Sequence, residues 1–289
     1  KPDPKTDPKT DAKSDSKAAA KPDAASDAAL DDAKRTYGGY LMGIQSYSLR
    51  NFPVDRVIEI VHNDLGLSAI EFYQIHLDPK ASDEQIKRIK EKTAEVGIKL
   101  TSHGVNNFGK NHDANRKLFE FAKKLGLKNI TADPSEDSFD SLDKLVEEYD
   151  IRIAIHNHGP GAKYSKVADV LGAIKDHHKN IGACADLGHF IRSAEDPVKA
   201  INLLEGRLYG IHLKDFVEQT PKAKGCILGQ GQLDLEGVFK ALAKVKFPAD
   251  GFLSLEYEEK PNDPIADLQQ CLAAAADAAQ KVAKATSTN

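Results

Sequence analysis

The residues best suited to chemistry stand at the ends of short apolar runs along the chain. Four of them are ionisable and end or directly follow successive runs: His156, Asp186, His212 and Glu256. Brought together, two imidazoles and two carboxylates would offer mixed nitrogen and oxygen donors to one divalent metal, which suits Mn²⁺, Co²⁺, Fe²⁺ or Zn²⁺ better than Ca²⁺ or Mg²⁺. The alternative is a buried polar network without a metal, in which these groups must pair with one another at a desolvation cost.

The period of a β-strand indicates that these four side chains share one face. Residues two apart in a strand point the same way. The residue two before each of the four is small, as is the next one back from Asp186: they are Ala154, Cys184, Gly182, Gly210 and Ser254. The other parity carries large aliphatic residues suited to packing against helices: Ile153, Ile155, Ile211, Leu213, Leu253 and Leu255. We therefore expect the four ionisable side chains to project inward at one level of a closed sheet.

The elements that must position them alternate regularly. Strands are expected at 41–49, 69–73, 99–105, 129–133, 152–158, 181–187, 208–215 and 251–257. Helical patterns lie between them, near 54–65, 82–97, 115–126, 140–149, 166–177, 196–205, 235–245 and 263–283. This alternation predicts an α/β fold, a single (β/α)₈ TIM barrel over residues 37–285, whose active site lies at the carboxyl ends of the strands. A doubly wound open sheet is the competitor, but IQSYSLRNFP after the first run is no phosphate-binding glycine turn.

Composition excludes several classes of protein. The 289 residues include 40 Lys+Arg and 44 Asp+Glu, which gives a net charge of −4 and no electrostatic reason to expect a nucleic-acid partner. No run approaches eighteen apolar residues, so no membrane span is expected. The three cysteines, Cys184, Cys226 and Cys271, are too few and too scattered for a disulfide framework or a thiolate zinc site.

The first 36 residues differ sharply from the rest. They hold eight basic and eight acidic residues, with repeated prolines and no aromatic residue. Such a segment cannot bury enough apolar area to offset its chain entropy, so we expect a disordered tether over 1–36. A charged spacer of this kind often follows a removed export signal, which favours an extracytoplasmic (periplasmic or secreted) location over a cytoplasmic one.

Five short motifs follow one another on the later strands and loops. They are IHNHG at 155–159, DLGH at 186–189, HLKD at 212–215, LGQGQLD at 228–234 and LSLEYE at 253–258. Together they make residues 41–283 resemble the xylose isomerase-like barrels, which include sugar phosphate isomerases and epimerases, inosose dehydratases and apurinic endonucleases.

The resemblance implies one divalent metal held by Glu, Asp, His and Glu from strands five to eight. The last three fall on Asp186, His212 and Glu256, whereas the first falls on His156. The family's epimerases use their two metal-binding glutamates as facing acid and base, and only one remains here. In the segment around His156, this chain resembles the inosose dehydratases more than the epimerases, because the inosose dehydratases too carry a His-x-His segment. The functional lysine of the xylose isomerases falls on His158.

The implied function is a metal-dependent sugar isomerase or epimerase, or a dehydratase or lyase, acting on a small sugar or sugar derivative. In each case the carbon beside a carbonyl loses a proton and an enediolate forms. Candidates for moving that proton are Glu256, His158, Lys214 and His103. Candidates for binding the substrate are Glu71, Asn157 and His189 for hydroxyl groups and Arg192 for a phosphate or carboxylate.

Structural and non-catalytic interpretations of these residues stay open. Lys214 and Asp215 could form a structural ion pair, and the barrel could bind a sugar without turning it over. An apurinic endonuclease-like phosphodiesterase is less favoured. Those enzymes carry an Asp-x-His after strand seven, where this chain reads FVEQTPKAKGC.

Overall fold

The computed structural model describes residues 33–287, so residues 1–32 of the expected tether lie outside the described part. Residues 33–36 form a helical turn, and Tyr37 directly after it is buried in the core. The described chain therefore joins the folded body a few residues before the expected boundary at 37.

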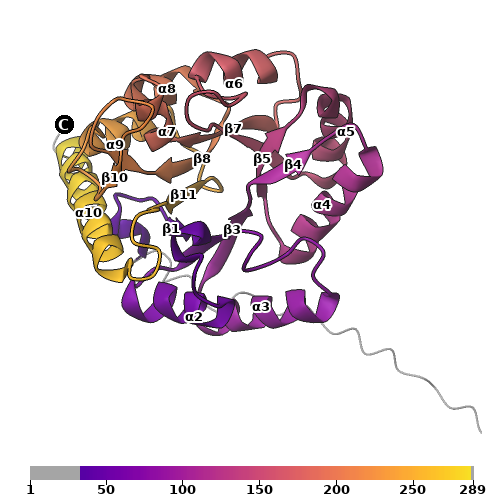
Figure 1. Cartoon of the computed structure of the whole chain (residues 1–289), viewed down its shortest axis with the longest axis horizontal. Coiled ribbons are helices and arrows are strands. Elements are labelled where there is room, and N and C mark those ends of the chain that lie inside the picture. The colour runs from indigo at the N-terminus through magenta and orange to yellow at the C-terminus, as the bar shows by residue number, and fades with distance from the viewer. Residues whose placement is uncertain (1–32, 288–289) are drawn as a thin grey trace, which may run out of the picture.

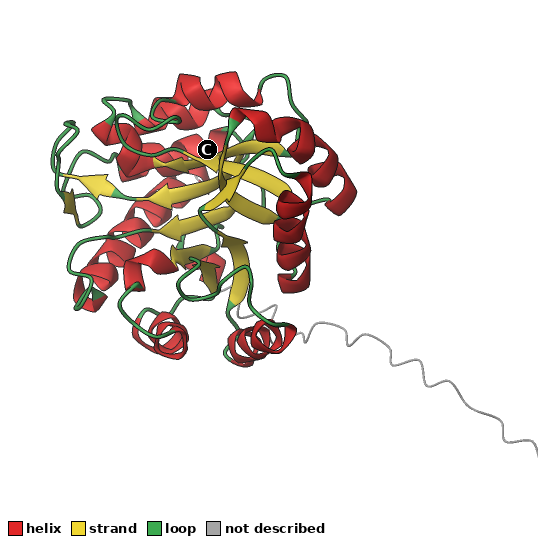
Figure 2. Cartoon of the chain, turned by 45° about the vertical axis from the view of Figure 1, so that its right-hand side comes forward, coloured by secondary structure: helices red, strands yellow, loops and turns green. Residues whose placement is uncertain are grey.

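One curled parallel sheet forms the centre of the molecule, ringed by helices (Figures 1 and 2). Its strands are β1 (Met42–Gln45), β2 (Ala69–Phe72), β3 (Lys99–His103), β4 (Asn106–Phe108), β5 (Asn129–Pro134), β6 (Arg152–His156), β7 (Ile181–Asp186), β8 (Leu208–Leu213) and β11 (Phe252–Leu255). Their order is β3-β2-β1-β11-β8-β7-β6-β5-β4, and every pair within this sheet is parallel. The two edge strands, β3 and β4, are consecutive in the chain, which closes the sheet on itself. The TIM barrel is confirmed.

The barrel closes at a break within the third expected strand. Residues 99–108 form two short strands because the chain passes close to β5 at Gly104, where a Cβ would lie 2.4 Å from the carbonyl oxygen of Thr131. The hydroxyl groups of Ser102 and Thr131 lie 2.9 Å apart across the join. One expected strand thus becomes β3, paired with β2, and β4, paired with β5.

Helices cover the outside of the sheet. They are α2 (Val54–Glu59), α3 (Asp83–Glu95), α4 (His112–Leu125), α5 (Phe139–Tyr149), α6 (Val167–Ile174), α7 (Leu187–Arg192), α8 (Pro197–Leu203), α9 (Leu235–Lys244) and α10 (Ile265–Ser287). Local sequence explains their ends: Ser82 and Gln85 form a capping box at the start of α3, and Gly126 adopts φ 77° at the end of α4. The apolar face of α3, including Ile86 and Ile89, is buried.

Large rings fill the barrel interior beneath the strand ends, which explains the small residues there. A Cβ on Gly210 would lie 2.1 Å from the ring of Phe252, and one on Gly182 would lie 2.5 Å from the ring of Tyr209. Both rings pack with Ala154 and Cys184 in one buried cluster. The barrel interior is thus densely packed beneath the side chains at the carboxyl ends of the strands.

Two elements were not expected from the sequence. The helix α7 follows β7 directly, and a hairpin of β9 (Asp215–Phe216) and β10 (Gly225–Cys226) follows β8. The carboxylate of Asp215 anchors the chain beyond the hairpin. It accepts backbone N–H groups from Phe216, Gly229, Gly231, Gln232 and Leu233. Asp215 therefore serves backbone amides rather than the ammonium of Lys214.

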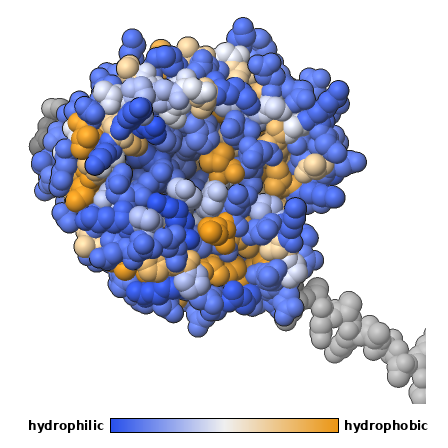
Figure 3. Space-filling model, viewed as in Figure 1, coloured by the Kyte–Doolittle hydropathy of each residue, from blue (hydrophilic) through white to orange (hydrophobic). Residues whose placement is uncertain are grey.

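The outer surface is largely hydrophilic, with separate apolar patches on the face shown in Figure 3. Ile75, Leu203 and Val217 are the large hydrophobic residues that stand exposed in the described chain. Between residues 33 and 287, none of the helices is both long enough and apolar enough to span a bilayer.

Candidate metal centre and active site

The four side chains predicted to converge do converge. His156 ends β6, Asp186 ends β7, His212 lies in β8 and Glu256 directly follows β11, and their potential ligand atoms all lie within 4.8 Å of one another. His212 Nδ1 lies 3.0 Å from His156 Nε2 and 3.1 Å from Glu256 Oε2. His156 Nε2 lies 3.5 Å from Asp186 Oδ2. All four residues are buried, so this is a compact cluster in the carboxyl-terminal mouth of the barrel.

A fifth residue orients the cluster from below. Glu71 Oε2 lies 2.8 Å from His212 Nε2, and both side chains are fully buried. The same carboxylate accepts hydrogen bonds from the hydroxyl groups of Ser254 and Thr131. Because a carboxylate only accepts hydrogen bonds, His212 carries its proton on Nε2 and turns Nδ1 toward the cluster, the arrangement typical of a metal-binding histidine.

The donor set fits a divalent cation. Among residues 33–287, Asp186 Oδ2 and Glu256 Oε2 are buried side-chain oxygens without a hydrogen bond of good geometry. Both oxygens contact the ammonium of Lys214, at 2.9 and 2.8 Å, and they also face two imidazole nitrogens, a donor set that suits a divalent cation. His156, Asp186, His212 and Glu256 are the residues that would hold it.

The charges in the cluster are set by competition between burial and neighbouring ions. Burial alone would raise the pKa of Asp186, but interactions with His189, Lys214 and His156 outweigh burial and lower that pKa well below its ordinary value. Glu256 behaves in the same way, with its pKa lowered by Lys214 and His212 against the effect of burial. The pKa of Lys214 is raised well above its ordinary value, since Asp186 and Glu256 outweigh burial. Two carboxylates and one ammonium group therefore stand charged together.

A cavity of about 380 Å³ opens above the cluster. The polar residues that line it come from most of the barrel strands: Gln45, Tyr47, Tyr73, Gln74, Asn107, Asp133, His156, His158, His189, Lys214, Glu256 and Glu258. The rings of Tyr47 and Tyr73 meet edge to face at 5.0 Å and form one wall. Sequence reasoning missed Gln45, Tyr47, Asn107 and Glu258. Gln45 ends β1, Tyr47 follows it, Asn107 lies in β4 and Glu258 follows β11. Counting back by strand period from the four ionisable residues reaches none of them.

Four of the predicted catalytic and binding residues line this cavity: His158, His189, Lys214 and Glu256. Burial lowers the pKa of His158 to about 4 and that of His189 to about 3. Both rings are therefore neutral near pH 7. They can accept a proton or a hydrogen bond from a bound molecule.

The other four predicted residues do not line this cavity. Glu71 is fully buried beneath His212, as described above. Asn157 is buried and exchanges hydrogen bonds with the backbone of Asp186, donating to its carbonyl oxygen at 2.9 Å and accepting its N–H at 2.8 Å. Arg192 lies in a neighbouring cavity, where its guanidinium donates to the carbonyl oxygen of Pro221 and covers the ring of Phe216.

His103 points out of the barrel. Its Nε2 lies 2.8 Å from the carbonyl oxygen of Leu77, and its ring meets that of Phe121 edge to face at 4.9 Å. The reason is parity, because the neighbouring Ser102 takes the inward position on β3. His103 therefore belongs to the packing between sheet and helices and not to the cavity.

Comparison with known proteins agrees with this architecture. The family model described as "Xylose isomerase-like TIM barrel" matches residues 61–275, and the chain belongs to this family. An inosose dehydratase of Clostridium botulinum is 27% identical over 137 residues, covering 42% of this chain and 45% of that enzyme. The chain thus spans about half the length of the curated relatives it matches.

Solved structures show the same fold. A putative uncharacterized protein of Parabacteroides distasonis superimposes with a TM-score of 0.65 at 27% identity, covering 84% of this chain and 98% of that one. The structure of an L-ribulose 3-epimerase gives a TM-score of 0.68 at 17% identity, with 86% and 97% covered.

Proposed function

We propose that this protein is a metal-dependent enzyme acting on a hydroxy-ketone sugar or sugar derivative, from which it removes the proton beside the carbonyl. The observation that carries the proposal is the cluster of His156, Asp186, His212 and Glu256 at the floor of a polar cavity. A divalent metal such as Mn²⁺, Co²⁺, Fe²⁺ or Zn²⁺ held there supplies Lewis-acid stabilisation of negative charge on substrate oxygens.

The chain's own residues supply the proton transfers. His158 faces the cavity as a neutral imidazole and accepts the proton from the carbon beside the carbonyl. Lys214 lines the same cavity as a charged ammonium only 4% exposed, and it donates hydrogen bonds to the developing oxyanion or to a leaving hydroxyl group. His189 and the Tyr47–Tyr73 wall position the sugar hydroxyl groups.

The composition of the cluster favours elimination over epimerisation. An epimerase must return a proton to the opposite face of the same carbon, and its relatives use two facing glutamates for this purpose. Here His156 stands where the second glutamate would be, so only Glu256 remains. Loss of a β-hydroxyl or alkoxyl group needs one base and one acid, which this cavity has. The similarity to inosose dehydratases supports the same direction.

Proton exchange provides the test. The protein is stripped with a chelator, reloaded with Mn²⁺, Co²⁺ or Zn²⁺, and incubated in deuterated water with ketoses, inososes and 3-keto-glycosides. We expect NMR to show deuterium beside the carbonyl, or an unsaturated product, for one of these classes. The matched control is Glu256→Gln, which should show neither. A metal-loaded protein that exchanges no proton in any class would instead be a sugar-binding barrel.

A further inference from the structure

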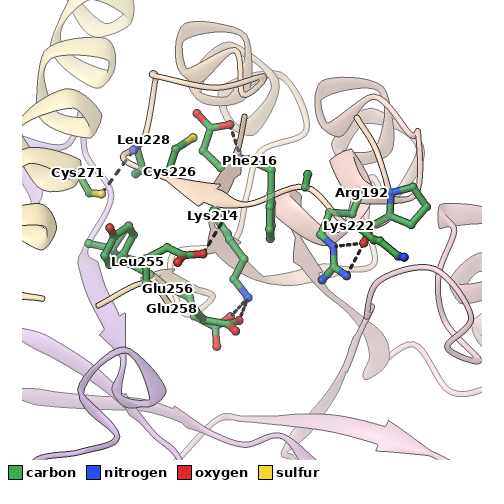
Figure 4. A pocket seen from close by; sticks show the side chains of 16 residues that line it. Arg192, Lys214, Phe216, Lys222, Cys226, Leu228, Leu255, Glu256, Glu258 and Cys271 are labelled. Atoms are coloured by element: carbon green, nitrogen blue, oxygen red, sulfur yellow. Dashed lines mark hydrogen bonds and ion pairs between the residues drawn. The ribbon is translucent and has the colours of Figure 1, made fainter. Parts of the chain in front are cut away.

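Lys214 occupies an unusual place for a lysine. It follows β8, two residues after His212, and is 4% exposed. Its Nζ lies 2.9 Å from Asp186 Oδ2, 2.8 Å from Glu256 Oε2 and 2.5 Å from Glu258 Oε1. Figure 4 shows the lysine reaching down to the carboxylates of Glu256 and Glu258.

The first two of these oxygens are the same atoms that a metal in the cluster would need. Asp186 Oδ2 and Glu256 Oε2 face the imidazoles of His156 and His212, and both also contact the ammonium of Lys214. A divalent cation and the lysine therefore draw on one pair of negative charges.

The fold is shaped to hold the lysine there. Its aliphatic stem passes over α7 at Gly188, where a Cβ would lie 2.6 Å from Lys214 Cγ. The ring of Phe216 closes the same space, at 2.7 Å from that Cβ position. Glu258, whose side chain is 41% exposed, contacts the ammonium as a third carboxylate. The position of the charge is thus fixed by packing as well as by ion pairs.

We propose that Lys214 is a specificity-determining residue that sets which metal the centre accepts. The inference rests on the metal site of the proposed function. Mg²⁺ and Mn²⁺ bind mainly through the charge of oxygen ligands, whereas Zn²⁺ and Co²⁺ gain much of their affinity from imidazole nitrogen. An ammonium about 3 Å from both carboxylates weakens the carboxylate contribution and leaves the imidazoles untouched. The lysine therefore selects for Zn²⁺ or Co²⁺ and against Mg²⁺ and Mn²⁺.

The test compares metal affinities of the stripped full-length protein, measured by titration against a competing chelator. Lys214→Met keeps the length of the side chain and removes its charge. We expect it to bind Mn²⁺ and Mg²⁺ about tenfold more tightly than the unsubstituted protein, with a smaller gain for Zn²⁺, so that the preference for Zn²⁺ over Mn²⁺ shrinks. The matched control is Lys222→Met in the neighbouring cavity, which should change each affinity less than about twofold.

Three outcomes overturn the proposal. If folded Lys214→Met binds Mn²⁺ no more tightly than the unsubstituted protein, Lys214 does not select the metal, although the metal site itself stands. If the affinities of Lys214→Met for all the metals rise equally, Lys214 weakens metal binding without selecting among the metals. If neither protein binds any of the four metals, the proposed function fails as well. Should the Met variant not fold, Lys214→Gln provides the same comparison with a polar side chain.

Discussion

The two sides of the barrel carry different kinds of polar residue. The neighbouring strands β6, β7, β8 and β11 present every member of the metal-site cluster in the described chain, with their donor atoms facing one another. On the rest of the barrel, β2, β3 and β5 present Glu71, Ser102 and Thr131, which hydrogen-bond among themselves and reach the cluster only through His212. The first group of strands supplies the side chains that could bind a metal. The second group supplies hydrogen bonds that orient His212. Substitutions on the two sides should therefore fail in different ways.

The largest effect is expected on the binding side. Glu256→Gln is isosteric but removes the negative charge and one anionic ligand. We expect the affinity for Zn²⁺ to fall more than about 100-fold, since loss of an outer partner alone costs 10- to 100-fold. The measurement is a chelator-competition titration. Glu258→Gln, on the adjacent and more exposed glutamate, is the control and should change the affinity less than about threefold. Equal effects of the two variants would remove Glu256 from the ligand set.

A smaller effect is expected on the supporting side. Glu71→Gln can donate its amide N–H to His212 Nε2, which moves the ring proton to Nδ1 and blocks that ligand atom. The affinity for Zn²⁺ should fall about 10- to 100-fold, and the visible spectrum of the Co²⁺-loaded protein should change. Ser254→Ala is the control. It removes a hydrogen bond to the same Glu71 oxygen without altering the proton on His212 and should leave the spectrum unchanged. An unchanged spectrum in Glu71→Gln would mean that Glu71 does not orient the histidine.

The smallest effect on metal binding is expected outside the barrel, at His103. His103→Gln should leave the affinity for Zn²⁺ within about twofold but lower the free energy of unfolding by about 1–3 kcal/mol through lost hydrogen bonds. Burial lowers the pKa of His103 below its ordinary value of 6.5, so the unfolded chain binds the extra proton first. The histidine's contribution to stability is therefore present above pH 6.5 and lost as the pH falls below it.

The variant should accordingly lose less stability than the unsubstituted protein between pH 7.5 and pH 5.5, as measured by urea denaturation at each pH. If His103→Gln lost more stability than the unsubstituted protein over this pH range, the buried ring of His103 would not be neutral in the folded protein. A large loss of Zn²⁺ affinity in His103→Gln would mean that His103 contributes to the metal site.

Strand period was enough to predict the barrel and the inward cluster. The four cluster residues lie at the carboxyl ends of neighbouring strands, where the two-residue period holds, so counting by two placed them correctly. The same counting failed where the strand is irregular. At β3 and β4 the chain breaks near Gly104, and between β7 and β8 the register skips Tyr209, which turns its ring into the interior next to Phe252. Such shifts depend on contacts between distant segments and leave no local signal.

Residue type alone also misled the prediction of roles. Glu71 and Asn157 were expected to bind hydroxyl groups of the substrate. Glu71 is satisfied by hydroxyl groups from two other strands, and Asn157 by the backbone of Asp186. Only the three-dimensional arrangement reveals such partners, and the same holds for cavity residues outside the expected strands, such as Asn107 and Glu258.

The anchoring carboxylate of Asp215 has a consequence for how this barrel tolerates change. Each amide it accepts comes from Phe216 or from residues 229–233, and none from the connection at 217–224. That connection could be lengthened, shortened or exchanged for a loop from another barrel while the chain on either side stays pinned. Since Pro221, Lys222 and Ala223 border the neighbouring cavity, this exchangeable loop shapes the edge of that cavity while Asp215 holds the chain on either side of the loop.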